Sequence, residues 1–508
     1  MKLYKSTLFF SLITFSLVAT AANDDSDYQK WLKQQKSSLN EFRDARDKEF
    51  TSFLEKQWKE MEVFSGIVRD PTPKPVNIPV AKPKPTPVVV APKPVTPTPN
   101  TKPTNNIPVK VKPLPIIVQV PKIKPPKIPP AVKPKPVAQL PKGERLTLNF
   151  FGNKLTFAVD PKFRKKLNHQ INSKSISTRW SHLSATKYEE TLKQIKQYKS
   201  PLQLNDWGYA LLVNALSQNI YPKSKDEQNL FTWFMLLKSG YKARVAYNSA
   251  GTYILFPTEQ KVYGAPYFTF NGSRYYSLSF DGSHQKLSGV LTYDGDYPNT
   301  DANFDMQLNK PLNTKNNSKL RNLSFRFKRK KYNIKVGLDK DIVHFFKTYP
   351  QLDIDLYFNS EVNKKIGTQL LTQLRPIING KSEVDAINTL LRFVQKSFKY
   401  QTDGKQFGKE NYLFLEETIF YPYSDCEDRA VMFAWLARNL LKTDVVGVGY
   451  PGHIATAVHI KSNVSGDSLM HEGKKYIIAD PTYINANMGQ SMPNFKQYKP
   501  KVIPIKSF

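Results

Sequence analysis

Residues 420–437 read FYPYSDCEDRAVMFAWLA and hold Cys426, the single cysteine among 508 residues. Ser424 and Glu427 have the S-x-x-E spacing of a capping box, which predicts that Cys426 lies in the first turn of a helix. The free N–H groups at a helix start favour a thiolate and can stabilise an oxyanion. We therefore expect Cys426 to be a nucleophile; an inert buried thiol and an intermolecular disulfide are the alternatives.

A helical apolar stripe supports this local prediction. Its members recur at helical spacing after the cysteine: Ala430, Phe433, Ala434, Ala437, Leu440 and Leu441. The neighbours Asp425, Glu427 and Asp428 disfavour a thiolate, so the cysteine needs a cationic partner, for which imidazolium is the usual choice.

Two histidines follow in PGHIATAVHI, residues 451–460. The alternation of small and apolar residues predicts a strand that opens at Pro451-Gly452, with His453 at its mouth and His459 further along. Because a residue at a strand end is easily placed in a cleft, we expect His453 to be the base. His459 is the alternative.

A carboxylate follows the next apolar run, YIIADPTYIN, residues 476–485. Asp480 ends this predicted strand, since Pro481 cannot continue the ladder. It could accept a hydrogen bond from the imidazole and hold the useful tautomer; a plain turn residue is the alternative. The spacing of Cys426, His453 and Asp480 does not suit a metal site, and no cofactor motif stands out.

A similar segment occurs two hundred residues earlier in the chain. Residues 220–237, IYPKSKDEQNLFTWFMLL, resemble residues 420–437, and both segments lead into paired β-rich runs and a strand that ends in an acidic turn. We infer two tandem copies of one fold. Asp226 stands in the place of Cys426, and Gly251 or Thr252 stands near that of His453, so the first copy cannot perform thiol chemistry.

The motifs DCEDRA, a Gly-His strand and DPT, preceded by FVQKSFKYQTD, resemble the transglutaminase-like superfamily over about residues 381–483. The resemblance implies an α+β, papain-like core and acyl transfer through a thioester, with Cys426, His453 and Asp480 as nucleophile, base and orienter. One position departs from the family pattern, because Ala455 stands where an aromatic residue is common. Gln406 and Tyr412 are weak candidates for a second oxyanion donor.

The N-terminal region predicts export. Lys2 and Lys5, a short apolar run and the small residues Ala19 and Ala21 form a signal peptide, residues 1–21. Residues 22–68 predict an amphipathic helix, which could form a coiled coil and a homo-oligomer or bind a membrane surface. Residues 69–143 are rich in Pro and Lys, which predicts an extended polyproline spacer.

The net charge of +33 indicates anionic partners, such as a cell-wall or membrane-surface polymer bound by the linker; a solvated basic surface without such a partner is the alternative. Export argues against nucleic acid. The expected globular parts are a degenerate domain at 144–340 and a catalytic domain at 341–508, with the cysteine helix packed on an antiparallel sheet. We expect an exported peptidase or amide acyltransferase acting on protein or peptide at the cell envelope, periplasmic or extracellular. The alternative is a non-enzymatic binding or scaffold protein.

Overall fold

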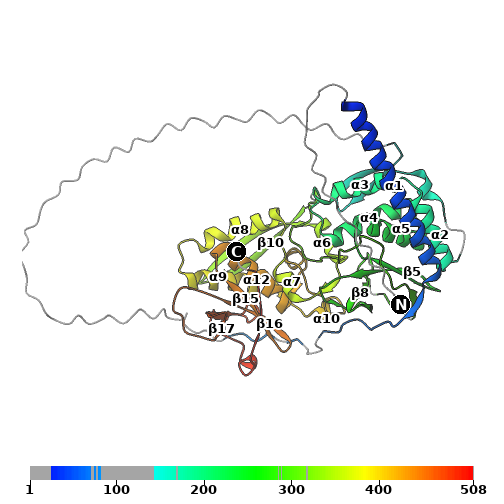
Figure 1. Ribbon diagram of the computed structural model, residues 1–508. Helices are drawn as coiled ribbons and strands as arrows, with labels where there is room; N and C mark the ends of the chain where they lie inside the picture. The colour runs from blue at the N-terminus through cyan, green and yellow to red at the C-terminus, as the bar shows by residue number, and fades with distance from the viewer. Residues whose placement is uncertain are drawn as a thin grey trace, which may run out of the picture.

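The computed structural model describes residues 24–69, 74–75, 78–81, 142–166, 170–283, 285–287, 289–315 and 318–506. The expected signal peptide and residues 82–141 of the expected linker lie outside these ranges. The described chain is of the α+β class, as predicted, and nearly all its strands pair antiparallel (Figure 1). None of the helices in the described ranges combines the length and apolar character needed to span a membrane.

The first half of the fold begins with an N-terminal helix and a short strand. Its elements are α1 (Asp24–Lys56), β1 (Lys59–Met61), β2 (Glu144–Phe150), β3 (Asn153–Val159), η1 (Pro161–Arg164), α2 (Ser173–Ser184), α3 (Tyr188–Lys199), α4 (Asp206–Ile220), α5 (Lys225–Lys238), β4 (Arg244–Asn248), β5 (Gly251–Pro257), β6 (Val262–Tyr263), β7 (Tyr267–Phe270), β8 (Ser273–Ser277) and β9 (Val290–Thr292). The apolar residues of α4 and α5 are buried nearly all round, which places these helices at the centre of this half.

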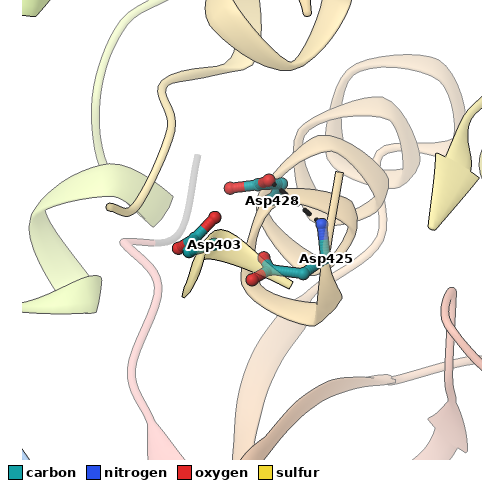
Figure 2. A group of neighbouring side chains, drawn as sticks. All are labelled: Asp403, Asp425 and Asp428. Atoms are coloured by element: carbon teal, nitrogen blue, oxygen red, sulfur yellow. Dashed lines mark hydrogen bonds between the residues drawn. The ribbon is translucent and has the colours of Figure 1, made fainter. Parts of the chain in front are cut away.

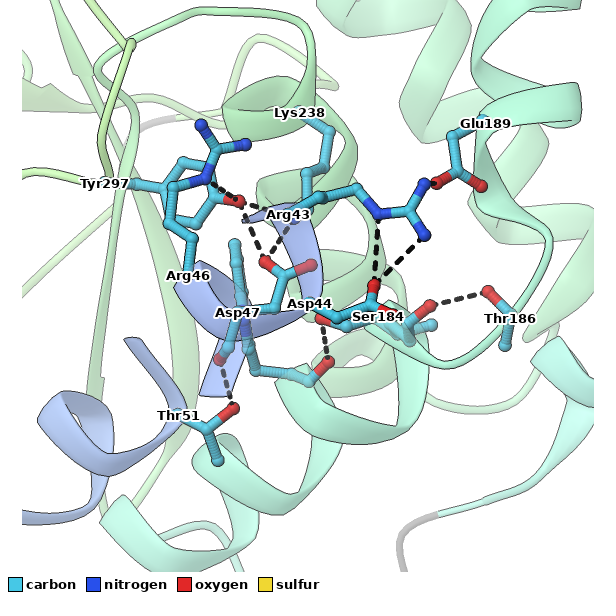
Figure 3. A network of polar contacts seen from close by, with 12 residues as sticks. Arg43, Asp44, Arg46, Asp47, Thr51, Ser184, Thr186, Glu189, Lys238 and Tyr297 are labelled. Atoms are coloured by element: carbon cyan, nitrogen blue, oxygen red, sulfur yellow. Dashed lines mark hydrogen bonds and ion pairs between the residues drawn. The ribbon is translucent and has the colours of Figure 1, made fainter. Parts of the chain in front are cut away.

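Helix α1 packs on α2 within the same chain. Phe50 and Leu54 on its C-terminal part enter the hydrophobic core. Figure 3 shows the polar contacts beside them, in which Asp47 binds Lys238 and accepts a hydrogen bond from Tyr297 at 2.8 Å. The apolar residues nearer the N-terminus, Trp31, Leu39 and Phe42, stay exposed. Within the described ranges, the chain therefore buries the C-terminal part of the helix and leaves these three apolar side chains exposed.

The helix ends at Lys56, so its predicted extent to residue 68 is wrong. Residues 59–61 instead pair as β1 with the edge strand β9, because the free edge of that sheet offers backbone hydrogen bonds. Isolated bridges continue along the chain, from Phe64 to Tyr267 and from Ile67 to Tyr263. Tertiary pairing thus overrides the helical pattern here.

The second half contains the cysteine helix. Its elements are β10 (Ser318–Phe327), β11 (Lys330–Asp339), α6 (Lys340–Lys347), β12 (Gln351–Leu352), α7 (Ile354–Phe358), α8 (Lys364–Ile378), α9 (Glu383–Ser397), β13 (Lys399–Tyr400), α10 (Asp403–Gln406), α11 (Leu415–Phe420), β14 (Tyr423–Ser424), α12 (Cys426–Leu441), β15 (Val445–Tyr450), β16 (His453–Val458), β17 (Ser468–His471), β18 (Lys474–Ala479), η2 (Pro493–Phe495) and β19 (Lys501–Ile503). The β10–β11 hairpin packs on α8 and α9, so these strands associate with the second half although they precede residue 340.

The two larger sheets have corresponding strand orders. The first runs β7-β8-β5-β4-β9-β1, and the second runs β17-β18-β16-β15-β19. In each, a helix (α5 or α12) leads into a hairpin, a second hairpin pairs beside it, and a last strand adds to the other edge. Both helices pack on the hairpin that follows them. One continuous hydrophobic cluster joins the two halves, with Trp207, Tyr349 and Phe414 among its members.

Candidate functional site

Helix α12 begins at Cys426, as predicted, but the predicted capping box is wrong. Asp425 is the N-cap residue, and Asp428 Oδ2 accepts the backbone N–H of Asp425 at 3.2 Å. Ser424 lies one residue earlier, in β14. The carboxylate of Glu427 accepts a hydrogen bond from the cysteine sulfur.

The thiol of Cys426 is buried and donates a hydrogen bond to Glu427 Oε2 at 2.9 Å. Burial raises the pKa of this thiol well above its usual value, and the neighbouring carboxylate of Glu427 raises it further. These effects outweigh the preference of a helix start for thiolate. In this arrangement the sulfur is a neutral thiol at neutral pH.

His453 and Asp480 lie together at the end of the sheet. His453 Nε2 donates to Asp480 Oδ2 at 2.9 Å, since a carboxylate can only accept. Asp480 is held by the backbone N–H groups of Thr482 (2.8 Å) and Tyr483 (3.2 Å), both of which donate to Oδ1. The other imidazole nitrogen, Nδ1, is buried and has no hydrogen-bond partner among the described residues.

The topology brings this pair to the same end of the domain as the cysteine. Strand β15 follows the C-terminus of α12 and returns along the helix, so Tyr450 and its hairpin partner His453 lie level with the helix start. Strand β18 pairs antiparallel with β16 and ends at Ala479, just before Asp480. However, no hydrogen bond joins the Cys426 sulfur to His453 in the described part of the chain.

An aromatic ring covers the imidazole, although Ala455 departs from the family pattern. Phe495, from η2, stacks on His453 with ring centroids 4.8 Å apart and an interplanar angle of 8°. Tyr450 packs beside both rings, with its centroid 5.3 Å from that of Phe495 and 6.3 Å from that of His453. Ala455 packs in a separate apolar cluster. A residue distant in sequence therefore supplies the ring beside this imidazole.

The other histidine and the weak oxyanion candidates lie elsewhere. His459 follows the far end of β16, where its backbone N–H binds Asp444 O beyond the C-terminus of α12, and its Nδ1 contacts Lys475 O. This position rules out His459 as the base for Cys426. Neither Gln406 nor Tyr412 hydrogen-bonds the cysteine within the described ranges, and the Tyr412 ring stacks against the Arg69 guanidinium, 3.4 Å from the ring centroid.

In the first half, Asp226 lies at the start of α5 and Gly251 at the end of the β4–β5 hairpin, places like those of Cys426 and His453 in the second half. Asp226, in the first turn of α5, accepts hydrogen bonds on Oδ1 from Thr252 N (2.7 Å) and Thr252 Oγ1 (2.9 Å). Gly251 closes the β4–β5 hairpin as His453 closes the β15–β16 hairpin. A Cβ placed on Gly251 would lie 2.8 Å from Asp226 Oδ1. A side chain at position 251 would thus point toward Asp226.

Buried carboxyl groups surround the start of α12. Figure 2 shows Asp403, Asp425 and Asp428, whose carboxylate oxygens lie within 4.8 Å of one another. We call the site lined by Asp403, Asp425 and Glu427 the acidic pocket. Lys74 enters it, and the lysine ammonium lies 2.6 Å from Asp425 Oδ2. Sequence reasoning assigned Lys74 to a spacer and missed this contact. No local pattern could have revealed it, because 351 residues separate the two partners.

A cavity of about 320 Å³ lies between the two halves. Its lining includes Ser279 and Asp281 from the first half and Tyr412 and Phe414 from the second. Cys426, His453 and Asp480 are not part of that lining. These three residues therefore lie outside the lining of this cavity.

Comparisons of the chain with protein-family models, with curated proteins and with solved structures return no match.

Proposed function

We propose that this chain is an exported, transglutaminase-like cysteine enzyme that transfers acyl groups of protein or peptide substrates at the cell envelope. The acceptor is water in a peptidase or an amine in an amide acyltransferase. One observation carries the proposal: His453 is oriented by Asp480 through Nε2, which leaves the buried Nδ1 as the proton-accepting nitrogen at the end of the sheet where α12 begins.

We also infer that the two halves are tandem copies of one papain-like core. The corresponding strand orders and the helix before each sheet support this inference. The contact between Asp226 and Thr252, and the direction of a Cβ on Gly251, support the facing of Cys426 and His453 in the second copy. The first copy lacks both a thiol and an imidazole at these places and acts as a non-catalytic partner.

In the proposed reaction, the Cys426 sulfur attacks the substrate carbonyl carbon while His453 Nδ1 takes the thiol proton. The backbone N–H groups at the start of α12 stabilise the oxyanion. His453 returns the proton to the leaving amine as the carbon–nitrogen bond breaks, and a thioester remains. Water or an acceptor amine then attacks the thioester and releases the sulfur. Asp480 acts as a positioning residue.

A second candidate function is a non-enzymatic envelope binding or scaffold protein. The buried thiol favours it, because Cys426 donates to Glu427 and its pKa is raised by burial and by that carboxylate. On the enzymatic proposal, this neutral thiol is a resting state. It becomes reactive once Glu427 turns away and His453 replaces it as the partner of the sulfur.

Acylation by p-nitrophenyl acetate tests the two candidates. The enzymatic proposal predicts release of one equivalent of p-nitrophenol and acetylation of Cys426, measured by mass spectrometry on the full chain. Cys426→Ala abolishes this labelling, and His453→Ala slows it by about 10²–10⁴-fold. His459→Ala is the matched control and retains the wild-type rate.

The same experiment is repeated with the Lys74→Met variant, in which the acidic pocket beside the cysteine no longer holds an ammonium group. Acylation of Cys426 at equal rates with and without the imidazole of His453 would contradict the enzymatic proposal. So would a thiol that stays unlabelled in both the wild-type and the Lys74→Met chain, which would favour the binding protein.

A further inference from the structure

The described residues between 64 and 81 contact both halves of the protein in succession. Phe64 bridges to Tyr267 in the first half. Val80 pairs in parallel with Ile484 in the second half, just beyond Asp480, and Ala81 N donates to Ile484 O at 2.8 Å. Ala81 is buried in a small apolar cluster with Phe495, the ring that stacks on the imidazole. Residues 78–81 are therefore packed on the second half, which corrects the prediction that an extended spacer runs from residue 69 to residue 143.

Lys74 lies between these anchor points and inserts its ammonium into the acidic pocket. The Nζ atom is 2.5 Å from Glu427 Oε1, 2.6 Å from Asp425 Oδ2 and 3.6 Å from Asp403 Oδ2. Glu410 adds a contact at 2.8 Å at the more exposed rim. The lysine side chain is only 11% exposed. Four carboxyl groups thus gather around one ammonium.

The pocket is more acidic than a structural ion pair requires. Asp425 is fully buried, and its Oδ1 has no hydrogen-bond partner among the described residues. Burial, followed by the charge of Asp425, raises the pKa of Asp403 to about 9 and that of Glu427 to about 8. Burial opposes the charge on Lys74 as well, yet the carboxylates outweigh it and raise the pKa of the ammonium. The surrounding carboxylates therefore favour the charged form of Lys74 despite its burial.

The geometry favours an ammonium over a divalent metal ion. Of the three aspartates, Asp428 already uses both oxygens as acceptors, from Leu413 N at 3.1 Å and from Asp425 N at 3.2 Å. Asp403 Oδ2 accepts from Asn411 N at 2.8 Å. The carboxylate oxygens that accept no backbone N–H are enough for the three donors of an ammonium, but they are too few for the six or more ligands that a hard metal ion prefers.

We propose that Asp403, Asp425 and Glu427 form a binding site for the lysine ammonium of an extended peptide, and that Lys74 occupies this site in cis. The inference rests on the proposed function, because the pocket has Cys426 between two of its members and would fix which residue of a substrate reaches the sulfur. It follows that Lys74 leaves the pocket before the lysine of a substrate peptide enters.

Peptide binding to the full-length chain tests this proposal. The probe is a fluorescent peptide copy of residues 71–81, PTPKPVNIPVA, and its twin carries norleucine in place of lysine. In Lys74→Met, the lysine peptide should bind about tenfold or more tightly than the norleucine peptide, measured by fluorescence anisotropy. Lys328→Met removes an exposed ion pair with Asp385 and should bind the probe as weakly as the wild-type chain does.

The double variant Cys426→Ala/Lys74→Met separates this proposal from the enzymatic one, since it should keep the peptide affinity without any thiol chemistry. Equal binding of the lysine and norleucine peptides, or no binding of either, would overturn the ammonium site. Stabilisation of Lys74→Met by Ca²⁺ without peptide binding would assign the pocket to a metal ion and would likewise overturn it.

A measurement on the wild-type chain guards against a variant that fails to fold. Acetylation by an amine-directed ester should modify Lys74 at least about tenfold more slowly than the exposed Lys59, because only the deprotonated amine reacts. An excess of the lysine peptide should displace Lys74 and accelerate its acetylation. Modification of Lys74 as fast as Lys59, or no acceleration by the peptide, would count against an exchangeable ammonium site.

Discussion

Replacement of Asp480 by asparagine should move the imidazole hydrogen to the wrong nitrogen. Asp480 Oδ1 accepts the backbone N–H groups of Thr482 and Tyr483. An asparagine keeps its carbonyl oxygen at that place, because the opposite orientation sets its N–H₂ group against two donors. Its amide nitrogen then donates to His453 Nε2, which must accept. The ring hydrogen moves to Nδ1, the atom that should receive the thiol proton.

The size of the effect follows from these contacts. Turning the asparagine over would leave two buried backbone N–H groups unpaired, at a cost of about 1–3 kcal/mol each. The wrong tautomer is therefore favoured by about 2–6 kcal/mol. The analogous substitution in a serine protease triad lowers the rate by about 10⁴-fold, which is about 5 kcal/mol in the activation free energy. The two figures agree, so we expect acylation of Cys426 to slow by about 10³–10⁴-fold.

The assay is the burst of p-nitrophenol on acetylation of Cys426, with the thermal unfolding midpoint measured in parallel. Asp467→Asn is the matched control, since Asp467 also accepts a backbone N–H, from Ser491 at 2.9 Å, but does not contact His453. A rate for Asp480→Asn within about tenfold of wild type, with the fold intact, would refute the assigned roles of Nε2 and Nδ1.

Two further predictions concern the docking of α1 and the state of the thiol. Asp47→Asn should lower the free energy of unfolding by about 3–5 kcal/mol in urea denaturation, because it leaves the buried Lys238 ammonium without its partner; the exposed control Asp44→Asn should cost under about 1 kcal/mol, and equal effects would contradict the buried pair. Glu427→Gln should lower the pKa of the Cys426 thiol, since a neutral amide no longer repels the thiolate. Iodoacetamide alkylation rises with pH as thiolate forms, so the variant's profile should shift to lower pH; an unchanged profile would show that burial alone raises the thiol pKa.

Local sequence patterns were sufficient for several elements of the candidate site. The apolar stripe after Cys426 and the alternation after Pro451 identified α12 and β16, because helices and strands have characteristic side-chain periods. The structure also contains the hydrogen bond between His453 and Asp480 that the sequence pattern predicted. The catalytic roles of these residues stay predictions, as do the signal peptide, the envelope location and the anionic partners.

Tertiary structure decided what no local pattern encodes. The end of α1 at Lys56 depends on the free edge of β9. The position of the Lys74 side chain depends on the carboxylates of Asp403 and Asp425, more than three hundred residues away in sequence. The carboxylate of Glu427 contacts the Cys426 thiol and the Lys74 ammonium, and the second of these partners is distant in sequence. Sequence by itself therefore determined the α+β class and the residues that could react, because these follow from local periodicity and side-chain chemistry. Their protonation states and the occupant of the pocket follow from burial and long-range charge, which exist only once the chain has folded.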